Sequence, residues 1–341
     1  MGIATLERTP VNPMRLLRFP LLLCACALAS LAAEPVPVPV ADSPQVLIVM
    51  GAEGDADLGG KFRTQVGQWT NACARAGASF EVFGVAPAGA ETDREQLRLR
   101  IAASPTNGVS PLWIVLVGHG TWDGQDAKFN LRGPDITAAE MAQWLKPVTR
   151  PLAVINTASA SAPWIPALKG PRRVIISATR SGDEQNYTRF GGFLAEAIAD
   201  PSGDLDQDGQ TSLLEAFLRA STQTSEWYAT AGRLATEHPL IDDNADGLGT
   251  PAAWFRGTRA TKMASGGARP DGGVSRQFVL VQSPWEKQLP PEQRARRDAL
   301  ELELNRLRDR RPEPPNDAYY QKIEAIALEL ARLQAQPQSA P

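Results

Sequence analysis

Two apolar stretches of the sequence decide the fold: WIVLVGHG at residues 113–120 and LAVINTASASA at residues 152–162. Each stretch begins with an unbroken run of apolar residues and then changes to small or polar residues. Short unbroken runs of this kind are typical of strands buried on both faces, as in parallel sheets. Sites in such sheets lie at the carboxyl ends of the strands. We therefore expect the polar ends of both stretches to lie at one candidate site.

The surrounding sequence alternates between strand-like and helix-like segments. Further strands are expected at 46–50, 79–85 and 173–177, and helices at 62–76, 92–102 and 137–145. Strands that alternate with helices predict an α/β fold, in which a parallel sheet is flanked by helices on both faces. The expected α/β domain spans residues 45–260.

His119 and Ser159 follow the two apolar runs and are the candidate catalytic residues. A strand that ends in His-Gly, followed by a strand that ends in a turn of small residues, resembles the legumain/caspase-type cysteine peptidases. The resemblance covers about residues 46–250 and implies a caspase/legumain-like fold. It implies that His119 is the base and that Gly120 supplies a backbone donor for the oxyanion. It also implies that Ser159 stands where the family has its cysteine.

The expected cysteine nucleophile is missing, because no cysteine follows His119 in the chain. A register shifted by one residue places Ala158 at the nucleophile position instead. A serine hydroxyl is a far weaker nucleophile than a thiolate and generally needs a base oriented by a third group. No such group is obvious, although Asp123 is nearby in sequence. We therefore expect an inactive homologue, a binding or scaffold module for a peptide or protein ligand. The alternative is an active endopeptidase that uses Ser159 with His119.

The stretch DLDQDGQTSLLE at residues 204–215 matches the twelve-residue EF-hand loop at each defining position. Gly209 supplies the sharp turn, and Glu215 closes the loop with a bidentate carboxylate. Oxygen ligands of this kind select a hard cation, so the sequence predicts a structural Ca²⁺ ion. The predicted ligands are Asp204, Asp206, Asp208, Gln210 (through its carbonyl), Ser212 and Glu215.

The stretch DDNADG at residues 242–247 is a second acidic turn. Counted from Asp242, its twelfth residue is Ala253, so the closing carboxylate of an EF-hand loop is absent. The sequence favours a turn over an ion site here.

An export signal is predicted at residues 1–33, because basic residues precede an apolar stretch, 19–29, that is too short to span a bilayer. Small residues follow it, as a cleavage site requires. The stretch CAC at 24–26 leaves an acylated, envelope-attached lipoprotein as a weaker alternative. The Pro-rich residues 34–44 are expected to form an extended linker. The expected location is the periplasm or the exterior, with no transmembrane segment in the mature chain.

The last part of the chain is expected to be a helical hairpin at residues 286–335, after a Gly-rich linker at 261–285. Leucine and isoleucine residues recur on one face of each helix. These two apolar stripes either pack internally or form an arm that binds a partner; the shortness of the hairpin favours internal packing.

Length and composition limit the classes of function. A chain of 341 residues accommodates one or two domains. Its net charge is −3, so no basic footprint points to nucleic acid as a partner. Only Cys73 remains after the predicted signal, so no internal disulfide can form.

Overall fold

The computed structural model describes residues 43–87, 89–267 and 269–335, which cluster into one compact unit. The predicted export signal and nearly all of the Pro-rich linker lie outside the described residues. Within the described ranges, no helix combines the length and the apolar character that a membrane span requires.

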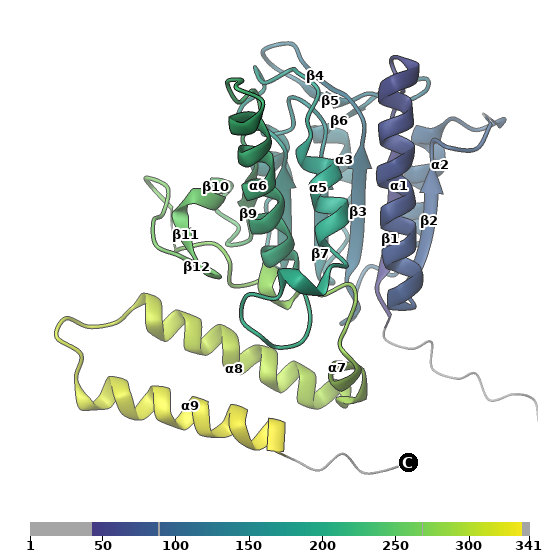
Figure 1. The fold of residues 1–341 in the computed structure, drawn as a ribbon. Coiled ribbons are helices and arrows are strands. Elements are labelled where there is room, and N and C mark those ends of the chain that lie inside the picture. The colour runs from purple at the N-terminus through teal and green to yellow at the C-terminus, as the bar shows by residue number, and fades with distance from the viewer. Residues whose placement is uncertain (1–42, 88, 268, 336–341) are drawn as a thin grey trace, which may run out of the picture. The chain divides into compact units, whose positions relative to one another are not determined.

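A seven-stranded sheet forms the centre of this unit, in the order β10-β9-β8-β7-β3-β1-β2 (Figure 1). The parallel strands are β1 (Gln45–Met50), β2 (Ser79–Phe83), β3 (Leu112–Val117), β7 (Leu152–Asn156) and β8 (Arg173–Ser177). Two short strands, β9 (Leu240–Asp242) and β10 (Thr250–Pro251), extend one edge in antiparallel pairing. The prediction of an α/β fold with a mostly parallel sheet is confirmed, and the antiparallel edge is an addition to it.

Helices cover both faces of the sheet. One face carries α1 (Ala56–Ala76), α5 (Phe190–Ala197) and α6 (Leu213–Thr230), and the other carries α2 (Asp93–Ala103), α3 (Ala138–Trp144) and α4 (Trp164–Leu168) (Figure 1). Successive side chains of a strand point to opposite faces. Ile48 of β1 therefore belongs to the first hydrophobic core, and Val49 belongs to the second.

Several short elements were not expected from the sequence. A three-stranded antiparallel sheet of β4 (Gly120–Trp122), β5 (Ala127–Phe129) and β6 (Ile136–Thr137) follows β3. The short helix α4 is also unexpected, as are β11 (Phe255–Arg256), β12 (Arg259–Ala260) and the 3₁₀ turns Pro201–Gly203, Ala252–Trp254 and Ser275–Gln277. Strands of two or three residues are too short to produce an alternating pattern that sequence can show.

The C-terminal helices are α7 (Pro284–Gln288), α8 (Pro291–Asp309) and α9 (Asp317–Ala335), and α9 lies against α8 (Figure 1). Residues 261–285, expected as a linker, contribute side chains to the interior, including those of Ser275 and Phe278. They are held there because the buried carboxylate of Asp243 accepts hydrogen bonds from the N–H groups of Gly272, Val274 and Ser275.

Candidate functional site

The two apolar stretches become the neighbouring parallel strands β3 and β7, whose carboxyl ends meet at one edge of the sheet. Leu116 of β3 pairs with Asn156 of β7. The segments that follow the strands, residues 118–120 and 157–159, therefore come together at that edge. This is the place where the sequence predicts the candidate catalytic residues.

The side chain of Ser159 binds the backbone of Gly120. Its hydroxyl donates a hydrogen bond to the carbonyl oxygen of Gly120 at 2.9 Å and accepts one from the N–H of Gly120 at 3.2 Å. Ser159 is 3% exposed, so no bulk water competes with these bonds. Gly120 has to be glycine here, because a Cβ atom at this position would lie 2.3 Å from the carbonyl oxygen of Ser159. The hydroxyl therefore ties together the ends of the two strands.

The ring of His119 lies in a different environment. It meets the ring of Phe62 edge-on, with 5.1 Å between the ring centroids. Its Nε2 faces Gly54, where a Cβ atom would approach to 3.1 Å. Across the described part of the chain, no hydrogen bond joins the His119 side chain to Ser159. The backbone N–H of Gly120, expected as the oxyanion donor, is already bonded to the Ser159 hydroxyl.

Neither Ala158 nor the free cysteine Cys73 supplies a reactive nucleophile. Ala158, which the shifted register places at the nucleophile position, is fully buried in the second hydrophobic core. Cys73 is buried on α1, and burial raises the pKa of its thiol to about 12. The reactive thiolate form is therefore scarce at neutral pH.

Sequence reasoning missed a histidine–carboxylate pair that joins the loop after β8, which holds Glu184, to the segment between α6 and β9, which holds His238. Nδ1 of His238 is hydrogen-bonded to the carboxylate of Glu184. The same carboxylate accepts a hydrogen bond from the N–H of Arg180, and the Glu184 carbonyl accepts one from the N–H of Ala160. The histidine oriented by a carboxylate is thus His238 rather than His119. Sequence offered no signal for this pair, because its members are 54 residues apart.

The predicted calcium loop brings three carboxylates together. One oxygen from each of Asp204, Asp206 and Asp208 lies within 4.8 Å of the others. Burial, followed by repulsion from Glu215 and Asp208, raises the pKa of Asp206 to about 6. An all-oxygen, acidic donor set of this kind fits a hard cation such as Ca²⁺, which would offset the repulsion.

Glu215, at the twelfth position of this loop, is 1% exposed and serves as an internal acceptor. Its Oε1 accepts hydrogen bonds from the N–H groups of Leu205 and Asp206 at 2.7 and 3.2 Å. Its Oε2 accepts from the N–H and the hydroxyl of Ser212 at 2.8 and 2.7 Å, which forms a capping box at the start of α6. Glu215 therefore both closes the loop and caps the start of α6.

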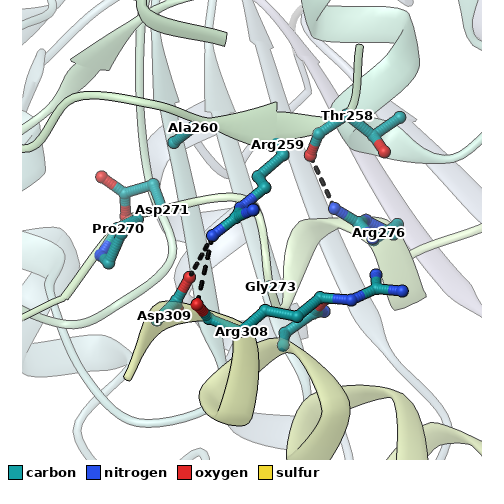
Figure 2. A pocket seen from close by; sticks show the side chains of 11 residues that line it. Thr258, Arg259, Ala260, Pro270, Asp271, Gly273, Arg276, Arg308 and Asp309 are labelled. Carbon is teal, nitrogen blue, oxygen red and sulfur yellow. Dashed lines mark hydrogen bonds and ion pairs between the residues drawn. The ribbon is translucent and has the colours of Figure 1, made fainter. Parts of the chain in front are cut away.

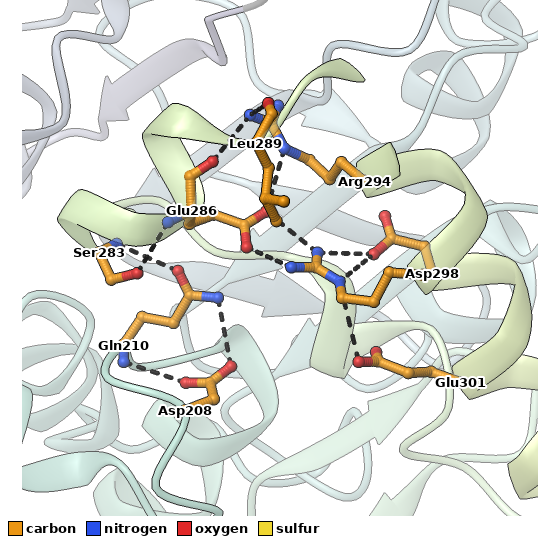
Figure 3. Close-up of polar contacts among 9 residues, drawn as sticks. Asp208, Gln210, Ser283, Glu286, Leu289, Arg294, Asp298 and Glu301 are labelled. Carbon is orange, nitrogen blue, oxygen red and sulfur yellow. Dashed lines mark hydrogen bonds and ion pairs between the residues drawn. The ribbon is translucent and has the colours of Figure 1, made fainter. Parts of the chain in front are cut away.

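Gln210, the seventh residue of the loop, connects it to the C-terminal helices (Figure 3). Its side-chain amide donates to the carboxylate of Asp208 at 3.2 Å and accepts from the N–H of Ser283 at 3.2 Å. Ser283 caps α7, where Glu286 forms ion pairs with Arg297 of α8. The acidic loop and the hairpin are thus joined by consecutive polar contacts.

The second acidic turn shares the backbone conformation of the first loop. Ala245 and Gly247 have positive φ angles, as Gln207 and Gly209 have at the same positions of the first loop. The carboxylate of Asp242 accepts from the N–H of Gly247 at 3.0 Å, as Asp204 accepts from Gly209 at 2.9 Å.

The closing carboxylate that the second turn lacks in sequence order is supplied by Asp271. Its Oδ1 accepts from the N–H groups of Asp243 and Asn244, and its Oδ2 accepts from the hydroxyl of Thr250. Sequence reasoning missed Asp271 because the spacing rule of the EF-hand considers only one continuous segment.

Comparisons with known proteins add little to this geometry. No family model matches the chain, and no curated protein matches it. The crystal structure of the Drosophila initiator caspase Dronc is similar at a TM-score of 0.36 and 12% identity, over 59% of this chain and 79% of that chain. A crystal structure of a Geobacter sulfurreducens protein is similar at a TM-score of 0.39 and 10% identity, over 58% and 92%. At these scores the likenesses carry no argument about the site.

Proposed function

We propose that this chain is an exported, non-catalytic relative of the legumain/caspase-type peptidases, which binds a peptide or protein segment at the carboxyl edge of its sheet. The observation that carries the proposal is the contact between Ser159 and Gly120. A nucleophile has to reach a substrate and be deprotonated by a base within hydrogen-bond distance. The hydroxyl of Ser159 is buried and bonded to Gly120 at both its donor and its acceptor sides.

The second support is the state of the oxyanion donor. Acyl transfer needs a free N–H group aimed at the oxygen that becomes negatively charged. The N–H of Gly120 donates to the Ser159 hydroxyl instead. A substrate carbonyl would have to displace this bond, and it would then meet an imidazole with no hydrogen bond to the serine. Binding without turnover is therefore the role that this arrangement favours.

The loops around the edge support a binding role, because they hold one another in place. Gly182 lies against the ring of Trp122, where a Cβ atom would come within 2.4 Å of the indole. The side chain of Gln185 donates to the carbonyl oxygen of Trp122 at 3.3 Å. The β4–β5 hairpin and the loop after β8 thus form a preorganised rim, which lowers the entropy cost of binding a flexible segment.

The proposal includes a structural Ca²⁺ ion in the loop 204–215. Asp204, Asp206 and Asp208 would supply side-chain oxygens and Gln210 its carbonyl oxygen. The ion would neutralise the loop at the start of α6, a helix that packs on α5 over the sheet. Its role there is stabilisation of the fold.

The alternative is an active endopeptidase in which Ser159 is the nucleophile and His119 the base. It requires that the Ser159 hydroxyl leave Gly120 and that the His119 ring turn from Phe62. The deciding experiment is incubation of the purified protein with a peptide mixture, with Ser159→Ala as the reference. Cleavage by the wild type that is lost in the variant would establish the alternative.

A further inference from the structure

A groove lies between the C-terminal end of α8 and residues 258–276 (Figure 2). Two adjoining pockets form it, and both are lined by Pro270, Gly273 and Asp309. The strand β12 and the 3₁₀ turn Ser275–Gln277 form one wall, and the last turn of α8 forms the other.

The groove has an unusual balance of charge for a chain whose net charge is −3. Its lining contains the five arginines Arg259, Arg269, Arg276, Arg306 and Arg308. The lining also includes three aspartates, but two of them are occupied. Asp243 accepts hydrogen bonds from the segment 272–275, and Asp271 accepts from Asp243, Asn244 and Thr250.

Asp309 is thus the carboxylate left to face the arginines. Burial raises its pKa, whereas Arg259, Arg269 and Arg276 lower it, so three guanidinium charges act on this one group. The closest ion pair, between Arg259 and Asp309, spans 3.9 Å. At this separation, and with the Arg259 side chain exposed, the ion pair neutralises little of the positive charge.

The pocket next to β12 is lined by Arg259, Arg276 and Arg308, and these side chains have N–H groups that are not fully used in hydrogen bonds. Arg276 donates to the carbonyl oxygen of Thr258 at 2.6 Å, but its Nε is buried without a partner. Arg259 donates to the carbonyl oxygen of Arg308 at 3.3 Å (Figure 2). The guanidinium of Arg308 is exposed, and it makes no ion pair within the described part of the chain. Guanidinium N–H groups that are not fully used within the protein can pair with an anionic acceptor that enters the groove.

We propose that this groove binds a phosphate group. The five arginines of the lining outnumber its three aspartates by two, and this excess of positive charge matches a dianion better than a monoanionic carboxylate. Planar guanidinium groups pair with phosphate oxygens through parallel hydrogen bonds. Because the arginines come from β12, the 3₁₀ turn and α8, a bound phosphate would also fasten the hairpin to the α/β unit. This inference stands independently of the peptide-binding role.

The test is calorimetric titration of the full chain with inorganic phosphate and, separately, with phosphoserine, at constant ionic strength and without calcium. We expect saturable binding of inorganic phosphate. If phosphoserine also binds, the natural ligand is a phosphate ester rather than free phosphate. The variant Arg308→Gln should weaken phosphate binding by about tenfold, because it removes one charge-assisted hydrogen bond. Because Arg308 is exposed, this variant retains the fold. Asp309→Asn should tighten binding by about threefold, since it removes the competing carboxylate.

The matched control is Arg310→Gln, which makes the same charge change next to the groove without lining it. It should bind phosphate as the wild type does. Equal losses in the Arg308 and Arg310 variants would reduce the effect to general surface charge and overturn the proposal. Failure of phosphate to saturate the wild type would overturn it as well.

Discussion

Glu215 and Asp271 close two acidic loops through three equivalent hydrogen bonds each. One oxygen of each carboxylate accepts from the second and third N–H groups of its loop, and the other accepts from a hydroxyl at the ninth position. Glu215 belongs to the same segment as its loop, whereas Asp271 comes from a different one. Both loops are therefore organised by a buried carboxylate that accepts backbone and hydroxyl hydrogen bonds.

Asp271 should make the stability of the fold depend on pH. Burial, followed by repulsion from Asp243, raises the pKa of Asp271 to about 8, against about 4 in an unfolded chain. The folded state thus binds the proton of Asp271 more tightly than the unfolded chain does. The contribution of this proton to the free energy of unfolding is therefore complete below about pH 4 and is lost as the pH rises through about 8. Asp271→Asn should flatten this decline in the free energy of unfolding, measured by urea titration in chelator from pH 5 to 9. An undiminished decline would contradict the assignment; Asp183→Asn, an exposed change, is the control.

Calcium should raise the melting temperature of the protein. Calcium at a hundredfold excess over its Kd stabilises the state that binds it by about 2.7 kcal/mol. Asp206→Asn should abolish this gain, yet cost little stability in chelator, because the charged form of Asp206 is already unfavoured by burial and neighbouring carboxylates. Melting curves with calcium and with chelator measure both effects, with Asp126→Asn as an exposed control. Identical wild-type melting curves with calcium and with chelator would contradict the prediction that the loop binds a stabilising calcium ion.

Gln210 should transmit calcium binding to the C-terminal helices. Its ligand atom is the backbone carbonyl, whereas its side chain contacts Ser283. Gln210→Ala should therefore keep the thermal gain from calcium but lose calcium-dependent protection of α7. Hydrogen–deuterium exchange of residues 284–288 measures this protection, and Gln321→Ala on α9 is the control. If the variant retained full protection, the contact with Ser283 would not be the link.

Gly120→Ala should destabilise the protein by about 1–3 kcal/mol, the usual cost of overpacking. The added Cβ would lie 2.3 Å from the carbonyl oxygen of Ser159 and would force the ends of β3 and β7 apart. Chemical denaturation gives the change in the free energy of unfolding. Gly60→Ala is the control, because a Cβ there meets nothing within 4 Å and favours the helix. A neutral effect at Gly120 would show that the strand ends can separate freely.

The centre of the sheet was predictable from the sequence because its middle strands consist mainly of short, buried apolar runs. The runs at 113–117 and 173–177 become β3 and β8 with almost unchanged bounds. The ends of the helices were harder to predict from the sequence, because capping side chains rather than apolar periodicity determine where a helix begins and ends. The start of α1 is fixed by Asp55, whose side chain accepts from the N–H of Leu58 at 2.8 Å, well before the first apolar residue at helical spacing.

The candidate site was predictable in position but not in its contacts. That His119 and Ser159 follow neighbouring strands could be read from the chain. The partner of the Ser159 hydroxyl could not, because it is backbone rather than side chain. Asp271 and the pair of Glu184 with His238 come from distant segments, and no local pattern joins them.

The central claim is that the Ser159 hydroxyl joins the ends of β3 and β7 through Gly120 and does not act as a nucleophile. The most direct measurement is mass-spectrometric detection of cleavage in a diverse peptide library, with wild type, Ser159→Ala and His119→Ala side by side. The account predicts that the wild type yields no more cleavage products than either variant. Cleavage by the wild type that both variants lose would contradict it.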